Sequence, residues 1–110
     1  MYINRALEKR ILNASKQFRA LIVTGPRQVG KTTLLKHLAE EGRKYVSLDD
    51  PMNREMAARE PALFLERNRP PAIIDEIQYA PNLLPYIKMH VDEYQNTGDF
   101  WLAGSQMFHS

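Results

Sequence analysis

The sequence contains no cysteine, which excludes disulfide bonds and thiolate-ligated metal sites. It also contains no apolar run near the roughly 20 residues that a membrane-crossing helix needs. The first ten residues, MYINRALEKR, carry charges where a secretory signal would be apolar. Because these absences fit a soluble protein of a reducing compartment, we expect a cytoplasmic location.

The net charge of +2 hides an uneven distribution along the chain. Residues 1–44 contain 10 Lys and Arg against 3 Asp and Glu, a net charge of +7. Residues 45–110 contain 5 against 10, a net charge of −5. A basic part can serve nucleic acid or another polyanion, but a solvated helix face together with a phosphate site also explains it.

Apolar runs typical of strands alternate with helical patterns along the chain. We expect strands at Ala20–Thr24, Lys44–Leu48, Ala72–Asp75 and Asp99–Ala103. We expect helices over residues 3–16, 31–41 and 81–95, and two short helical turns within 53–68 that separate at Pro61. This alternation predicts an α/β fold, a three-layer α/β/α domain over residues 1–110 with a parallel sheet of about four strands. The unbroken apolar run at Ala20–Thr24 predicts a strand buried on both faces.

One segment combines glycines, a lysine and threonines directly after the first strand. GPRQVGKT matches the Walker A pattern Gly-x-x-x-x-Gly-Lys-Thr at every fixed position. Glycine lets the backbone wrap a phosphate closely, and N–H groups at the start of the next helix point toward the anion. We expect Lys31 to reach the β- and γ-phosphates of a nucleotide and the Thr32 hydroxyl to bind Mg²⁺. The predicted nucleotide-binding residues are Gly25, Pro26, Arg27, Gln28, Val29, Gly30, Lys31, Thr32 and Thr33.

Two adjacent acids, Asp75 and Glu76, end the third predicted strand. Beyond a Walker A segment, such a strand end is typical of a Walker B motif. We expect Asp75 to hold Mg²⁺ and Glu76 to polarise the attacking water. The doubled acid favours hydrolysis over the transfer reactions of small-molecule kinases, and the sequence lacks the Asn-Lys-x-Asp segment of guanine-specific switch proteins.

Polar residues also follow the second and fourth strands. We expect Ser105 and Gln106 to act as sensors beside the γ-phosphate if the fourth strand lies between the first and the third. The predicted catalytic residues are therefore Glu76, Lys31, Ser105 and Gln106. Asp49 and Asp50 end the second strand, where we expect a turn or helix cap farther from the phosphate loop, and no metal site.

The histidines and the large aromatic residues carry weaker signals. The histidines show no spacing typical of metal ligands, and we expect all of them at the surface. The aromatic residues near the fourth strand are expected in the core and not in a base-stacking platform. These residues are His37, His90 and His109, and Tyr94, Phe100 and Trp101.

Four segments together resemble a family of bacterial and archaeal predicted ATPases of the AAA+ superfamily. The segments are GPRQVGKTTLL, YVSLDDP, AIIDEIQYAPNLLPYIKMHVDE and FWLAGSQ. The first is common to P-loop proteins, whereas DEIQ-x-AP-x-L and the GSQ ending are more specific. In this family an N-terminal ATPase domain precedes a C-terminal domain of unknown function.

The resemblance implies a P-loop NTPase fold with the sheet order 5-1-4-3-2. It places phosphate binding on Gly25–Thr32, Mg²⁺ on Thr32 and Asp75, the base on Glu76 and the sensor on Ser105 or Gln106. Relatives usually have threonine where this chain has Ala103.

Relatives also continue through a fifth strand, a helical lid and a further domain, so the resemblance implies an N-terminal fragment. Without a fifth strand, Ala20–Thr24 would be an exposed apolar edge and a site of pairing or self-association. Four arginines remain unplaced candidates for an arginine finger, namely Arg54, Arg59, Arg67 and Arg69.

Three functions remain open from the sequence. The first is an ATPase module that binds Mg-ATP and hydrolyses it slowly. The second is a nucleotide-binding switch or interaction module with little or no turnover, which differs from the first in whether Glu76 activates water. The third is a nucleic-acid-binding protein, although the chain shows no aromatic–basic interleaving and no known nucleic-acid motif.

Overall fold

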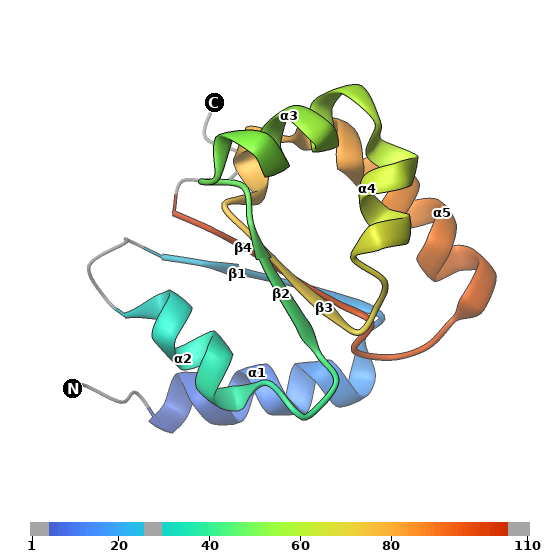
Figure 1. The fold of residues 1–110 in the computed structure, drawn as a ribbon. Helices are drawn as coiled ribbons and strands as arrows, with labels where there is room; N and C mark the ends of the chain where they lie inside the picture. The colour runs from blue at the N-terminus through green and yellow to red at the C-terminus, as the bar shows by residue number, and fades with distance from the viewer. Residues whose placement is uncertain (1–4, 26–29, 106–110) are drawn as a thin grey trace.

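Helices and strands alternate along the chain, as the sequence predicts (Figure 1). The structure is a computed structural model that describes residues 5–25 and 30–105. The strands are β1 (Ala20–Thr24), β2 (Lys44–Ser47), β3 (Ala72–Asp75) and β4 (Phe100–Gly104). The helices are α1 (Arg5–Gln17), α2 (Lys31–Leu38), α3 (Pro51–Arg59), α4 (Pro61–Arg67) and α5 (Leu84–Tyr94), and two 3₁₀ turns, η2 (Ile77–Tyr79) and η3 (Pro81–Leu83), separate β3 from α5.

The four strands form one parallel sheet in the order β1-β4-β3-β2. β4 pairs with β1 from Ala20↔Phe100 to Thr24↔Gly104, and β3 pairs with β4 on its other side. Helices α1 and α2 cover one face of the sheet, and α3, α4 and α5 lie over the other (Figure 1). The predicted three-layer α/β architecture and the position of the fourth strand between the first and third are thus confirmed.

Two apolar clusters, one on each face of the sheet, hold the layers together. Beneath α1 and α2, Trp101 of β4 packs with Ile11 and Leu35. On the opposite face, Phe64 of α4 and Ile87 of α5 pack against the sheet. Burying a side chain of this size stabilises the fold by roughly 1.5–3 kcal/mol. Every residue of β3 and β4 is buried, so the carboxyl ends of these two strands are firmly held.

β1 is buried on only one face, which corrects the prediction that both faces are covered. Leu21 and Val23 face the cluster beneath α1 and α2. Ile22 points to the opposite face and is 53% exposed. The apolar run alone did not distinguish a central strand from an edge strand, and among the described strands β1 lies at an edge.

The predicted element boundaries hold to within a few residues. Helix α2 ends at Leu38, three residues before the predicted end. The helix expected over residues 81–95 divides into η3 and α5, with Pro85 in the first turn of α5, where proline costs least. Asp50 accepts a hydrogen bond from the Met52 N–H at 2.8 Å, so the predicted cap is confirmed at the start of α3.

The expectations for the aromatic residues and histidines hold only in part. Phe100 and Trp101 are buried in the core, but Tyr94 is 54% exposed because it is the last residue of α5. His37 is exposed as expected. His90 is half-buried and lies 3.0 Å from Asp99, so its predicted surface position is wrong. His109 lies outside the described residues.

Candidate functional site

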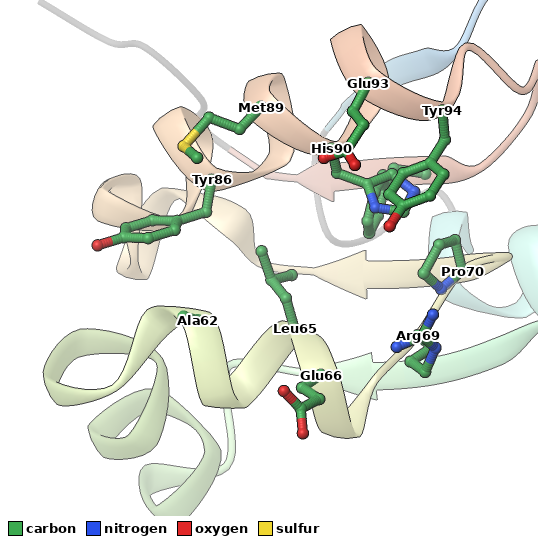
Figure 2. Close-up of a pocket in the computed structure, with 11 residues that line it drawn as sticks. Ala62, Leu65, Glu66, Arg69, Pro70, Tyr86, Met89, His90, Glu93 and Tyr94 are labelled. Atoms are coloured by element: carbon green, nitrogen blue, oxygen red, sulfur yellow. The ribbon is translucent and has the colours of Figure 1, made fainter.

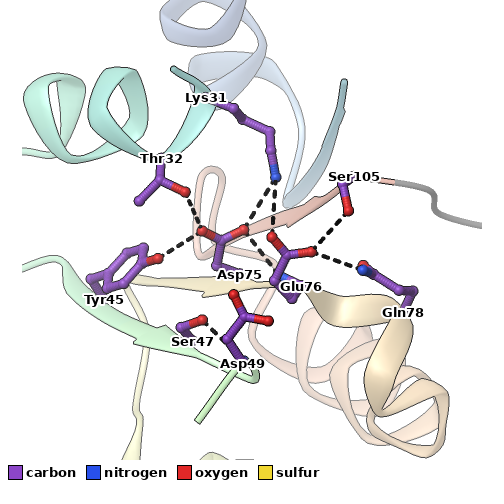
Figure 3. A network of polar contacts seen from close by, with 9 residues as sticks. All are labelled: Lys31, Thr32, Tyr45, Ser47, Asp49, Asp75, Glu76, Gln78 and Ser105. Atoms are coloured by element: carbon purple, nitrogen blue, oxygen red, sulfur yellow. Dashed lines mark hydrogen bonds and ion pairs between the residues drawn. The ribbon is translucent and has the colours of Figure 1, made fainter. Parts of the chain in front are cut away.

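A small polar cavity lies at the carboxyl edge of the sheet, beside the start of α2 (Figure 3). Its volume is about 280 Å³. Seven polar side chains from β2, β3, α2 and the segments that follow the strands line it, namely Lys31, Thr32, Tyr45, Ser47, Asp49, Asp75 and Glu76. Four of the residues predicted from the two motifs therefore meet in one place, although more than 40 residues separate the two pairs in the sequence.

The first turn of α2 presents two of these side chains, Lys31 and Thr32. Gly30, just before the helix, has φ of 70°, a left-handed conformation that residues with a Cβ rarely adopt. This turn of the backbone starts the helix, whose first N–H groups have no intrahelical partner and favour an anion. Before the loop, the Gly25 N–H donates to the Gly104 carbonyl at 3.3 Å, which ties the end of β1 to β4.

Asp75, which is 1% exposed, is the hub of the polar network. Its Oδ2 accepts hydrogen bonds from the Thr32 hydroxyl at 2.7 Å and the Tyr45 hydroxyl at 2.6 Å. Its Oδ1 accepts from the Lys31 ammonium at 3.3 Å. Burial alone would raise the pKa of Asp75, but the hydrogen bonds from Tyr45 and Thr32 and the charge of Lys31 outweigh it and lower the pKa below its usual value. Asp75 therefore carries a negative charge at neutral pH.

Glu76 is also buried, at 4% exposure, and its backbone is in the left-handed region with φ of 56°. Its Oε1 accepts hydrogen bonds from the Gln78 amide at 2.8 Å and from the Ser105 hydroxyl at 3.2 Å. Its Oε2 lies 4.0 Å from the Lys31 Nζ. The unusual backbone conformation of a residue other than glycine is typical of functional sites, and here it turns the side chain toward α2.

The sequence matches one known protein family. A family model described as AAA domain matches residues 17–110. The chain belongs to this family. A search of curated proteins and a search of solved structures each found no match. AAA domains are ATPase modules, so membership supports nucleotide binding and the predicted resemblance to AAA+ ATPases is confirmed at the level of the family.

Tyr45 is a member of the AAA-domain site that the sequence analysis missed. Burial and the neighbouring Asp75 carboxylate raise the pKa of Tyr45, so its hydroxyl stays protonated and donates at neutral pH. The Lys36 ammonium lies 4.4 Å from the centre of its ring. The sequence held one indication of this role, because the alternation along β2 puts Tyr45 and Ser47 on the same face of the strand. The missing information was which face turns toward the phosphate loop.

Asp49 lies closer to the site than its sequence position suggested. The expectation that the end of the second strand is farther from the phosphate loop is wrong for this residue, because Asp49 lines the cavity with Lys31 and Asp75. β2 pairs with β3 up to Ser47↔Asp75, so the two carboxyl ends lie side by side. The Asp49 N–H donates to the Ser47 hydroxyl at 3.1 Å, which fixes the turn.

Several predicted residues lie elsewhere or outside the described part of the AAA domain. Thr33 is exposed and lines no part of the cavity. Ala103, which the resemblance singled out, is fully buried with Val23 and Leu35. None of the four arginine-finger candidates lines this cavity. The guanidinium carbon of Arg54 lies 3.9 Å from the centre of the Tyr79 ring. The predicted residues Pro26, Arg27, Gln28, Val29 and Gln106 lie outside the described residues.

A larger cavity of about 420 Å³ lies between α4 and α5 (Figure 2). Leu65 of α4 and Met89 of α5 contribute apolar surface. On one side the rings of His90 and Tyr94 pack together at a tilt, with their centres 4.6 Å apart. The two cavities share no lining residue. The larger one lacks the combination of buried lysine, hydroxyl and carboxylates that marks the smaller one, so we do not assign it to nucleotide binding.

Over residues 5–25 and 30–105, no helix has both the length and the apolar character that a membrane crossing needs. The same part of the chain has no cluster of three or more histidines, cysteines, aspartates or glutamates arranged to hold a metal ion.

Proposed function

We propose that this protein binds Mg-ATP in the cavity at the carboxyl edge of the sheet and hydrolyses it there. The observation that supports this most strongly is the polar network that joins Lys31 and Thr32 of α2 to Asp75, the last residue of β3, and to Glu76, which follows it. A lysine and a hydroxyl at the start of a helix, facing two carboxylates, are groups that phosphoryl transfer uses. In this proposal the phosphates lie on residues 25–33, with Lys31 at the β- and γ-phosphates.

The oxygen atoms in the cavity suit Mg²⁺. The Thr32 hydroxyl and Asp75 Oδ2 are 2.7 Å apart, close to the roughly 3 Å expected between neighbouring ligands of an octahedral Mg²⁺. Mg²⁺ favours one or two protein oxygens, several waters and substrate phosphates over an all-protein cage. Thr32 and Asp75 would hold the ion, which would neutralise charge on the phosphates when bound.

In this proposal Glu76 acts as the general base. Hydrolysis forms a bond from the water oxygen to the γ-phosphorus and breaks the bond from that phosphorus to the bridging oxygen. ADP leaves with the electron pair of the broken bond, and the proton of the water passes to the Glu76 carboxylate. Lys31, 4.0 Å from Glu76 Oε2, would link the phosphate to the base. Ser105, which donates to Glu76 Oε1, would respond to the γ-phosphate, with Gln106 as the second sensor candidate.

Phosphate release from Mg-ATP by the 110-residue chain tests the proposal. We expect slow release that stops when EDTA removes Mg²⁺. ATP binding without any release would instead support a nucleotide-dependent switch, the second function left open by the sequence. Absence of both binding and release would contradict the proposal. Since the guanine-reading segment is missing, we expect ATP to compete better than GTP.

The Tyr45→Phe substitution tests the role of Asp75. It removes the hydroxyl that donates to Asp75 Oδ2 but keeps the ring beneath Lys36. We expect the Mg²⁺ concentration for half-maximal phosphate release to rise by about 10- to 150-fold, as for losing one hydrogen bond of about 1.5–3 kcal/mol to a charged group. Measuring release against Mg²⁺ at saturating ATP checks this. An unchanged Mg²⁺ dependence would show that Tyr45 does not orient the Asp75 carboxylate.

The exposed edge of β1 is a second proposed binding surface, for another copy of this chain. Among the described strands β1 pairs only with β4, and Ile22 exposes half of its apolar side chain beside the unpaired edge. We expect Ile22→Lys to reduce concentration-dependent self-association in sedimentation velocity experiments. Met52→Lys is the matched control, because Met52 is 80% exposed and belongs to helix α3 and not to a strand of the sheet. Equal association of the two variants would contradict an interface at β1.

A further inference from the structure

Gln78 lies outside the cavity lining but contacts the proposed base directly. It is the middle residue of η2, the 3₁₀ turn that begins right after Glu76. Its amide nitrogen donates to Glu76 Oε1 at 2.8 Å, and the Ser105 hydroxyl donates to the same oxygen at 3.2 Å (Figure 3). Two donors from different elements therefore hold one oxygen of the Glu76 carboxylate.

The orientation of the Gln78 amide follows from this contact. An ionised carboxylate only accepts hydrogen bonds, so Gln78 must turn its NH₂ group toward Glu76. Its own Oε1 then points away, and it is buried with no hydrogen-bond partner among the described residues. An unpaired buried acceptor costs stability. The Gln78 side chain therefore donates a hydrogen bond to Glu76, while its own carbonyl oxygen accepts none from the described residues.

These two hydrogen bonds fix the orientation of the Glu76 carboxylate. With Oε1 held by Gln78 and Ser105, Oε2 is the oxygen nearest Lys31, at 4.0 Å. Lys31 in turn contacts Asp75 Oδ1 at 3.3 Å. The left-handed backbone at Glu76 and the short η2 turn bring the Gln78 amide back onto the side chain. Rotation of the carboxylate would break two hydrogen bonds at once.

We propose that Gln78 is a positioning residue for Glu76, which holds Oε1 so that Oε2 faces the phosphate side of the cavity. This inference rests on the proposed function, because it assigns Glu76 the role of base. A neutral amide suits this position, since it donates to the carboxylate without adding charge. A carboxylate there would repel Glu76 and could not donate to it.

Two variants separate positioning from a structural role. Gln78→Met keeps the approximate length and removes the donor, so we expect kcat for phosphate release to fall by roughly 10- to 100-fold while ATP affinity changes little. Gln78→Glu places a second carboxylate at hydrogen-bond distance from Glu76. The two like charges repel, so we expect the Glu76 carboxylate to be displaced and kcat to fall at least as far as in Gln78→Met, again with little change in ATP affinity.

The other charged groups that face Glu76 stay the same in both variants. They are Lys31 on α2 and its partner Asp75, with Asp49 on the wall of the same cavity. Gln17→Glu and Gln17→Met are matched controls, because Gln17 is an exposed residue at the end of α1. We expect both controls to keep the wild-type rate. Circular dichroism establishes that each variant is folded.

A second readout keeps this test independent of turnover. Carbon-13 NMR of the glutamate carboxyl groups at one fixed pH reports the loss of the hydrogen bond from Gln78 to Glu76. We expect the Glu76 carboxyl signal to shift in Gln78→Met and to stay in place in Gln17→Met. An unchanged Glu76 signal in Gln78→Met, or a kcat loss matched by an equal loss of ATP affinity, would overturn the positioning role. Failure of the proposed function would differ, because the wild-type chain itself would then release no phosphate.

Discussion

The Lys31→Ala variant is expected to lose nearly all affinity for Mg-ATP. Lys31 is 4% exposed and donates to Asp75 at 3.3 Å, so its ammonium is held inside the cavity. In the proposed complex the Lys31 ammonium pairs with the phosphates, and truncating one partner of such a buried charge pair between protein and ligand costs roughly 2–4 kcal/mol of binding free energy. That corresponds to about 30- to 700-fold weaker binding. Calorimetric titration of Mg-ATP into the wild type and the variant measures the difference directly.

The same substitution also leaves Asp75 with fewer partners. Asp75 keeps its hydrogen bonds from Thr32 and Tyr45, so we expect the variant to fold with reduced stability. Thermal unfolding shows whether the fold is retained, and Lys31→Met provides a variant closer in volume. Lys88→Ala is the matched control, because Lys88 is an exposed lysine on α5 that pairs with Asp92. Equal ATP affinities for wild type and both Lys31 variants would refute the assignment of the phosphate-binding loop.

The Glu76→Gln variant is expected to bind ATP and to release almost no phosphate. The substituted amide can still accept hydrogen bonds from Gln78 and Ser105 through its oxygen, so the shape of the site is preserved. It cannot take up the proton of the attacking water. A positioned general base contributes roughly 100- to 10,000-fold to such reactions, and we expect a loss of at least about 100-fold in kcat.

Single-turnover phosphate release with enzyme in excess over ATP measures this effect without interference from product release. Glu93→Gln is the control for the change of charge, because Glu93 is an exposed residue of α5 outside the cavity around Lys31. We expect Glu93→Gln to behave as the wild type. A Glu76→Gln variant that releases phosphate at the wild-type rate would show that Glu76 is not the base.

The site was predictable from the sequence where a local pattern carries a chemical requirement. The turn before α2 needs a left-handed backbone at residue 30, which glycine adopts readily. The motif spacing identified Gly30 together with Lys31 and Thr32. The acidic end of β3 identified Asp75 and Glu76. The placement of the fourth strand between the first and third followed from the family resemblance, and the sheet order confirms it.

Residues whose roles depend on tertiary contact were not predictable in the same way. Tyr45 reaches Asp75 only because β2 lies beside β3 in a fixed register, which no local pattern specifies. Asp49 enters the cavity for the same reason. Gln78 contacts Glu76 through a short 3₁₀ turn in which residue 76 has a positive φ, a conformation that a glutamate does not signal. Ile22 was misjudged because edge and central strands share the same apolar pattern.

The most direct test of the proposed nucleotide site is a calorimetric titration of Mg-ATP into the 110-residue wild-type chain, repeated with EDTA. We expect saturable binding at one site, competition by ADP, and weaker binding when Mg²⁺ is removed. Absence of saturable ATP binding by a folded wild-type chain would contradict the central claim that the network around Lys31 and Asp75 is a nucleotide site.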